Sequence, residues 1–221
     1  MSEIAPNRCP PEAPFGIRRV QVGVGPKNAH PDWWNTDIRH FDGIDEVMDA
    51  TLPWKWDGIL DFVYAEHFLE HLDIAMGAQF LVNAGNALHP GGVLRLSTPS
   101  LEWVLSTHFS FTSAESPDQI TETLAINRAF HGWGHKFLYS RGLLNWLLRS
   151  VGFSQISFHE YGGSDHPQLK NMEAHGGWRT DFEYPSVWIV EAVRPNDRLE
   201  LRPETHARFH RDFLQHVQSG H

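Results

Sequence analysis

The sequence predicts an α/β fold in which a mostly parallel sheet of seven strands is covered by helices. Short apolar segments alternate along the chain with stretches of helical periodicity, which is the pattern of a parallel sheet with helical connections. A tight glycine turn follows the first apolar segment, as at many ligand sites of this class. The chain has 221 residues, 41% of them hydrophobic, which is enough for one domain with a sizeable core.

The expected strands are short and mostly apolar. They cover residues 20–24, 33–38, 47–49, 59–64, 92–98, 154–158 and 186–193. The run LDFVY in the fourth segment indicates a strand buried on both faces, and Pro99 ends the fifth.

Helices are expected at 68–88, 140–151 and 203–218. The first has apolar residues at helical spacing and stops at HPGG, and the second is amphipathic and closed by Gly152. The third is rich in charge and histidine. Residues 100–139 break this rhythm and predict a small cap insert, and the glycine-rich residues 161–184 predict a loop that either contacts substrate or crosses the surface.

The predicted organisation is a flexible proline-rich tail at 1–16, one domain at 17–195 and a helical extension at 196–221. The net charge of -9 disfavours a protein that binds nucleic acid through its phosphates, so a small molecule is the expected partner. Cys9 is the single cysteine, which excludes an intramolecular disulfide and a thiolate metal cluster and fits a cytoplasmic protein. The sequence shows neither a signal peptide nor a membrane-spanning run, so no membrane partner is expected.

The glycine turn departs from the dinucleotide-binding pattern. Gly23 and Gly25 are present, but Asn28 stands where a third glycine belongs. Between Gly25 and Trp33 lie seven residues, two of them prolines, which are too few for a stable helix. A pyrophosphate would lack its helix N-terminus, whereas a nucleoside without phosphate would lose little. The alternative is that this segment is simply a tight turn between two strands.

Several motifs carry a resemblance to a known family. In order they are VGVGPKN, WWNTDI, VMDATLPW, LDFVYAEHFLEHL, LHPGGVLRLSTPS and HKFLYSRGLLNWLLRSVGF. Together they resemble the class I S-adenosylmethionine-dependent methyltransferases, in particular a short bacterial group whose first helix is reduced to a loop. The resemblance covers about residues 18–193. It implies a Rossmann-like, mostly parallel seven-stranded sheet with helices on both faces, reduced first helices and a small cap insert.

The resemblance also implies a cofactor, S-adenosyl-L-methionine, and the residues that contact it. The glycine turn would lie beneath the methionine part, the acid ending the second strand would accept from the ribose hydroxyls, the acid after the third strand would lie near adenine, and the end of the fourth strand would line the sulfur. The cofactor residues implied are Gly23, Val24, Gly25, Asp37, Ile38, Asp49, Ala50, Thr51, Ala65 and Glu66. The residues alone leave alternatives open: Asp37 as a turn residue, Asp49 as a cap, and Glu66 as a charge at a helix N-terminus.

Methyl transfer from a sulfonium needs alignment and exclusion of water, and it needs a base only where the acceptor must lose a proton. Histidine titrates near neutrality, so His135 in the insert is the preferred base and His67 the second. His131 and His135 have the spacing of two metal ligands on a helix, but Gly132 and Gly134 disfavour a helix there, and no metal is expected.

The predicted function is methyl transfer to an oxygen or nitrogen of a small metabolite. AEHF follows the fourth strand in place of the proline-aromatic tetrapeptide of enzymes that methylate base amino groups. The alternatives are a non-catalytic binding or scaffolding subunit with the same fold and, third, a nicotinamide-dependent oxidoreductase. A sheet without its first two helices also leaves a face that a second copy of the chain could cover, as in a homodimer.

Overall fold

The structure is a computed structural model that describes residues 16–109, 118–175 and 183–218. It contains one seven-stranded sheet with the order β3-β2-β1-β4-β5-β7-β6. The strands are β1 Arg19–Val22, β2 Trp34–Asp37, β3 Glu46–Val47, β4 Leu60–Glu66, β5 Leu88–Pro99, β6 Ser154–His159 and β7 Val187–Val193. The first five pair in parallel, whereas β7 runs antiparallel to β5 and β6. The predicted α/β fold with a mostly parallel seven-stranded sheet is confirmed.

Turns and loops without a helix join β1, β2 and β3. Residues 23–33 form bends and turns, as the two prolines and the short spacing predict. The backbone N–H of Gly23 donates to the carbonyl of Thr36 at 2.9 Å, which closes the turn onto the neighbouring strand. The first two strands are therefore brought into register by this turn, with Val22 opposite Thr36.

The helix after β4 is α1, Ile74–Ala87, and it begins later than the expected residue 68. Asp73 sets this start, because its side chain accepts from the N–H groups of Ala75 and Met76. Before the cap, Leu69–His71 forms a separate 3-10 turn, η1. The strand β5 then begins at Leu88, before the expected residue 92, because Leu88 already pairs with Leu60.

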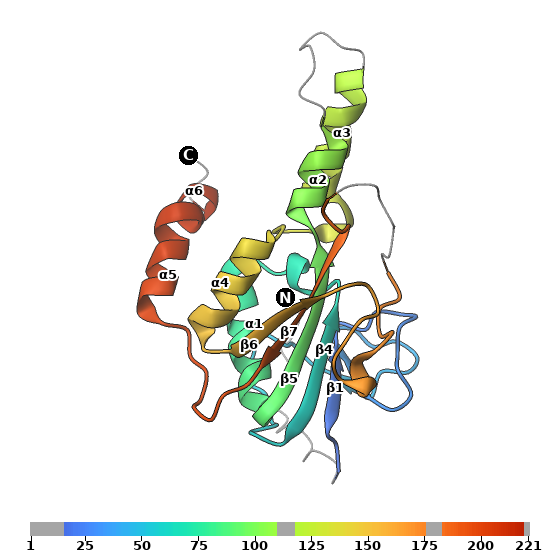
Figure 1. Cartoon of the computed structure of the whole chain (residues 1–221), viewed down its shortest axis with the longest axis vertical. Coiled ribbons are helices and arrows are strands. Elements are labelled where there is room, and N and C mark those ends of the chain that lie inside the picture. The colour runs from blue at the N-terminus through green and yellow to red at the C-terminus, as the bar shows by residue number, and fades with distance from the viewer. Residues whose placement is uncertain (1–15, 110–117, 176–182, 219–221) are drawn as a thin grey trace, which may run out of the picture.

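The insert after β5 is more regular than the sequence predicts. It contains two helices, α2 Leu101–His108 and α3 Asp118–His131, followed by the 3-10 turn η2 Gly132–Gly134. Figure 1 shows both helices standing out from one end of the sheet. Val104, Ala129 and Leu138 form the small core that joins them. Few other positions are buried among the described residues of α2 and α3, so the sequence lacks the apolar periodicity that would have predicted these helices.

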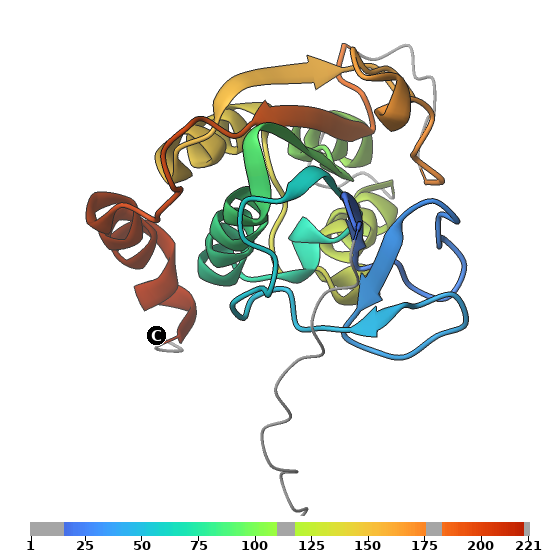
Figure 2. The same ribbon diagram turned by 90° about the horizontal axis from the view of Figure 1, so that it is seen from below.

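Helix α4, Arg141–Val151, follows the prediction closely. The Ser140 side chain accepts from the N–H of Leu143, and Gly152 ends the helix at φ +109°. The chain ends in α5 Pro203–Phe209, a π-helical turn η4 His210–Leu214 and α6 Gln215–Gln218. Figure 2 shows α1 and α4 beside one another on one side of the sheet, with the C-terminal helices outside them.

The main core lies between this side of the sheet and the helices, and it includes Phe80 of α1, Leu144 of α4 and Phe209 of α5. The opposite face carries a second cluster, made by Trp33, Tyr64, Val93, Leu169 and Met172. Leu169 ends the short 3-10 turn η3, Pro167–Leu169. Residues 169–172, between β6 and β7, thus pack on the face that the reduced first helices leave open. Across the described ranges, every helix is too short or too polar to cross a membrane.

Candidate cofactor and acceptor site

The glycine turn lies at the edge where the parallel strands end. Gly23 and Gly25 have φ +67° and +65°, the left-handed region that favours glycine. A Cβ added at Gly23 would lie 2.3 Å from Cδ2 of Phe68, so a side chain there has no room. At Gly25 none of the described atoms lies within 4 Å of an added Cβ. The backbone at Gly25 is therefore open to a ligand, while Gly23 and the buried Val24 fix the turn.

Asp37 ends β2 beside this turn and is buried, with 6% of its surface exposed. Its Oδ2 accepts from the N–H of Gly25 at 2.9 Å, and its Oδ1 accepts from the N–H of Arg39 at 2.9 Å. Each oxygen of an ionised carboxylate has two lone pairs, so one remains on each for a further donor. Asp37 is thus a turn residue, and it still has the acceptors that a ribose diol needs.

An apolar side chain lies next to these acceptors in the chain. Ile38, the residue after Asp37, is 64% exposed. A large apolar side chain this exposed, directly after the carboxyl end of β2, suits contact with a flat aromatic base. The residues at this edge therefore fit the nucleoside part of S-adenosylmethionine.

Asp49 has a local partner. Its Oδ1 accepts from the N–H of Thr51 at 2.9 Å and from the Thr51 hydroxyl at 2.7 Å, which is a side-chain cap of the following turn. The buried Ala50 accepts at its carbonyl from the indole N–H of Trp54. These contacts make Asp49–Thr51 a well-defined turn at the sheet edge, in agreement with the alternative of a cap.

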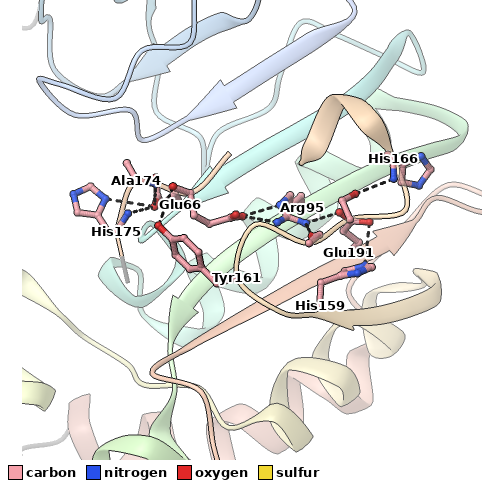
Figure 3. Close-up of polar contacts among 11 residues, drawn as sticks. Glu66, Arg95, His159, Tyr161, His166, Ala174, His175 and Glu191 are labelled. Carbon is pink, nitrogen blue, oxygen red and sulfur yellow. Dashed lines mark hydrogen bonds and ion pairs between the residues drawn. The ribbon is translucent and has the colours of Figure 1, made fainter. Parts of the chain in front are cut away.

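Glu66 ends β4, next to the buried Ala65, and it holds a segment that is distant in the sequence. Its Oε1 accepts from the backbone N–H groups of Ala174 and His175, both at 2.7 Å and 108 and 109 positions away. The next element is the short turn η1, and the Glu66 carboxylate points to residues 174 and 175. Glu66 therefore does not act as a charge at a helix N-terminus. Figure 3 shows this contact at one end of a polar network.

Arg95 anchors the rest of that segment to the sheet. It is fully buried on β5, where its Nη2 lies 2.7 Å from Glu173 and its Nη1 lies 2.5 Å from Glu191. It also donates to the carbonyl of Gly163, and the Tyr161 hydroxyl donates to the carbonyl of Glu173. Figure 3 shows Arg95 beside Glu191 in the middle of the network. These contacts fix residues 161–175 across the sheet and position residues 174 and 175 beside Glu66.

A cavity of about 650 Å³ opens beside Glu66. Its walls come from the ends of β4 and β5, from α2 and α3, and from the start of β7, with Trp103, Trp133 and Val187 among the apolar side chains. Five histidines line it: His67, His71, His108, His135 and His175. The structure therefore brings both predicted catalytic candidates, His67 and His135, into one cavity, and adds three histidines that local sequence patterns did not assign to it.

His67 has a strained backbone and a charged partner. Its φ of +45° is unusual for a residue with a side chain, and such outliers concentrate at functional sites. Its Nδ1 lies 3.0 Å from Oε1 of the buried Glu70, whose Oε2 accepts from the Thr98 hydroxyl. Burial disfavours the charged imidazole, but the hydrogen bond and charge of Glu70 outweigh burial and raise the pKa of His67.

His135 has a defined tautomer. Its Nδ1 lies 2.9 Å from the carbonyl of Ala129, and because a carbonyl can only accept, Nδ1 carries the hydrogen. The lone pair is then on Nε2, which can accept a proton or bind a cation. The residue follows η2, where Gly134 at φ +83° allows the chain to turn. His131, in contrast, is an exposed residue at the end of α3.

The chain has similar solved structures but no match among family models or curated sequences. Among solved structures, a S-adenosylmethionine-dependent methyltransferase from Mesorhizobium loti has a TM-score of 0.50 and 18% identity over 81% of this chain and 91% of that chain. A possible exported protein from Bordetella parapertussis has a TM-score of 0.51 and 17% identity over 81% of this chain and 63% of that one.

The present chain thus spans less than two thirds of the length of the Bordetella protein. The strand order with one antiparallel strand, together with the likeness to the Mesorhizobium enzyme, shows a class I S-adenosylmethionine-dependent methyltransferase fold.

Proposed function

We propose that the protein is an S-adenosylmethionine-dependent methyltransferase that moves a methyl group to an oxygen or nitrogen of a small metabolite. The observation that carries the proposal is the cavity of about 650 Å³ at the end of β4, on the same sheet edge as the turn at Gly25 and the carboxylate of Asp37. Its size is typical of small-molecule sites. The proposed nucleoside site and the proposed acceptor site would therefore lie along one edge of the sheet.

When bound, S-adenosylmethionine supplies an electrophilic methyl group, and the protein would hold the cofactor and the acceptor in position. Asp37 would hold the ribose with its remaining lone pairs, Gly25 would allow close approach of the backbone, and Ile38 would contact adenine. The apolar side chains of Trp103, Val104 and Val187 in the cavity wall would limit water around the reacting atoms, which would strengthen the polar contacts there. For an acceptor that must lose a proton, Nε2 of His135 is the first candidate base and His67 is the second.

Calorimetry tests the cofactor. We expect one equivalent of S-adenosylhomocysteine to bind and NAD to give no heat, because the turn after Gly25 has no helix N-terminus for a pyrophosphate. Heat with the dinucleotide and none with the sulfonium or its product would overturn the proposal.

Turnover is tested with S-adenosylmethionine labelled in the methyl group and a panel of hydroxylated and amine acceptors. We expect His135→Ala to lower the rate by roughly 100- to 10,000-fold with little change in cofactor affinity, because a base acts in the transition state. Tight cofactor binding without turnover on any acceptor would favour the binding or scaffolding subunit.

A further inference from the structure

Three potential metal ligands meet at the acceptor cavity. One ligand atom from each of Glu70, His71 and His135 lies within 4.8 Å of the other two. Both histidines line the cavity, and Glu70 is fully buried behind them. We propose that these three side chains bind one divalent transition-metal ion of the Zn²⁺ type.

The donor set suits such an ion. Two imidazoles and one carboxylate are ligands that Zn²⁺ and its neighbours in the first transition row accept. Three protein ligands also leave a coordination position free for water or substrate, which is the pattern of catalytic rather than structural zinc sites. Here that position would be filled from the cavity, since His71 and His135 both belong to its wall.

The ligands are oriented before any ion binds. The hydrogen on Nδ1 of His135 is committed to the carbonyl of Ala129, which leaves Nε2 as the ligand atom. The carboxylate of Glu70 is held by the Thr98 hydroxyl at 3.0 Å and by Nδ1 of His67 at 3.0 Å. Partners of this kind, which fix the tautomer of a histidine and the plane of a carboxylate, surround most protein metal sites.

The backbone holds the two halves of the cluster together. Glu70 and His71 belong to η1, and His135 follows η2, far along the chain. The N–H groups of Lys136 and Phe137 both donate to the carbonyl of Glu70, at 2.8 and 3.2 Å. The imidazole rings of His71 and His135 have centroids 5.2 Å apart. The arrangement is therefore built by paired main-chain bonds and does not depend on a chance approach of surface side chains.

This site differs from the one that the sequence suggested and then disfavoured. The spacing of His131 and His135 would need both on one helix, but α3 ends at His131, and His131 is exposed. The partner of His135 is His71, from another part of the chain. The expectation that no metal binds considered only His131 and His135, whereas the site proposed here uses His71 and His135.

A metal ion would change the role of His135 from base to ligand. A bound ion would lower the pKa of a coordinated hydroxyl, so the acceptor could release its proton to water in the cavity without a neighbouring imidazole as base. That consequence rests on the proposed methyl transfer, and it selects acceptors with a hydroxyl oxygen. Binding of the ion itself does not depend on methyl transfer and can be measured without cofactor.

The experiment uses the full chain without a polyhistidine tag, stripped with a chelator and titrated with Zn²⁺ by calorimetry and with Co²⁺ by visible absorption. We expect one ion per chain. His71→Ala and His135→Ala should each weaken Zn²⁺ binding by about 100-fold or more, because loss of a ligand exceeds the roughly 10- to 100-fold effect of losing an outer partner. His131→Ala is the matched control on α3 and should leave the affinity unchanged, as should His108→Ala in the cavity wall.

Glu70→Gln is a further variant, but Glu70 is fully buried and its loss can disturb the fold. The main test therefore uses the half-buried His71 and His135. Circular dichroism checks that each variant is folded. The proposal is overturned if the stripped chain binds no stoichiometric Zn²⁺ or if folded His71→Ala and His135→Ala bind as well as the parent. It is also overturned if His131→Ala weakens binding and His71→Ala does not. Cofactor calorimetry on the same stripped chain reports separately on the proposed function.

Discussion

Asp37→Asn separates the two roles of the Asp37 carboxylate. Its two oxygens accept from the N–H groups of Gly25 and Arg39, each at 2.9 Å, in a site that is nearly closed to solvent. Asparagine has the same shape but one oxygen, so its NH₂ group must face one of these two donors. One charge-assisted hydrogen bond is lost, and we expect the free energy of unfolding to fall by about 1.5–3 kcal/mol.

The same substitution should weaken cofactor binding if the remaining lone pairs hold the ribose. A further loss on the order of 1.5–3 kcal/mol corresponds to a roughly 10- to 150-fold increase in Kd. Denaturant unfolding measures the first effect, and calorimetry with S-adenosylhomocysteine, at a temperature where both proteins are folded, measures the second.

Asp45→Asn is the control. Asp45 lies just before β3, and its Oδ2 accepts from the N–H of Asn35 at 2.8 Å, so it also joins side chain to backbone along β2. Its loss should lower stability without changing Kd. A folded Asp37→Asn protein with the parent Kd would show that Asp37 serves the turn alone and would refute the reasoning about the diol.

Three further tests concern the turns, the polar network and the sheet. Gly23→Ala should destabilise the protein by about 1–3 kcal/mol more than Gly25→Ala in urea unfolding, because both residues have positive φ but only Gly23 lacks room for a Cβ; equal losses would contradict the packing of the turn. Arg95→Met should cost about 3–5 kcal/mol, since it leaves two buried glutamates without their cation, and should speed proteolysis within residues 160–175; an unchanged cleavage rate would show that other contacts anchor the segment. The hydrogen bond from Arg18 lowers the pKa of Asp61, so this pair adds stability above pH about 4 that is lost as pH falls through the lowered pKa. Asp61→Asn should therefore flatten the acid side of a plot of Tm against pH, and a plot identical to that of the parent would contradict this.

Local patterns in the sequence predicted the elements whose signals are themselves local. The caps Ser140 and Gly152 mark both ends of α4, and the prolines after Gly25 exclude a helix before β2. The hairpin of α2 and α3 was missed because its helices bury few residues beyond Val104 and Ala129, so no apolar stripe marks them. Apolar residues recur at helical spacing only where one face of a helix is buried, so a helix that stands away from the core lacks that signal.

The candidate site was predictable only in part, because many of its contacts join segments that are distant in the sequence. His67 and His135 were candidates because of residue type and position, and both line the cavity. The pairing of His135 with His71 and Glu70 arises from main-chain bonds between distant segments. Glu66 likewise contacts backbone 108 positions away. A single sequence contains no local signal for such contacts, because they form only when the whole sheet is assembled.

The helix-free connections of β1, β2 and β3 would couple the proposed cofactor binding to local unfolding of the chain. Side-chain oxygens hold these turns to the backbone, at Asp37 and Asp49 among others, and such segments open at a lower free energy than a helix-covered core. A ligand that binds only the closed turns adds RT ln(1 + [L]/Kd), about 2.7 kcal/mol at a hundredfold excess over Kd. Amide hydrogens in residues 23–51 then exchange more slowly as ligand is added. The concentration of cofactor in the cell would set not only how much of the protein is loaded but also how long this half of the sheet survives proteolysis.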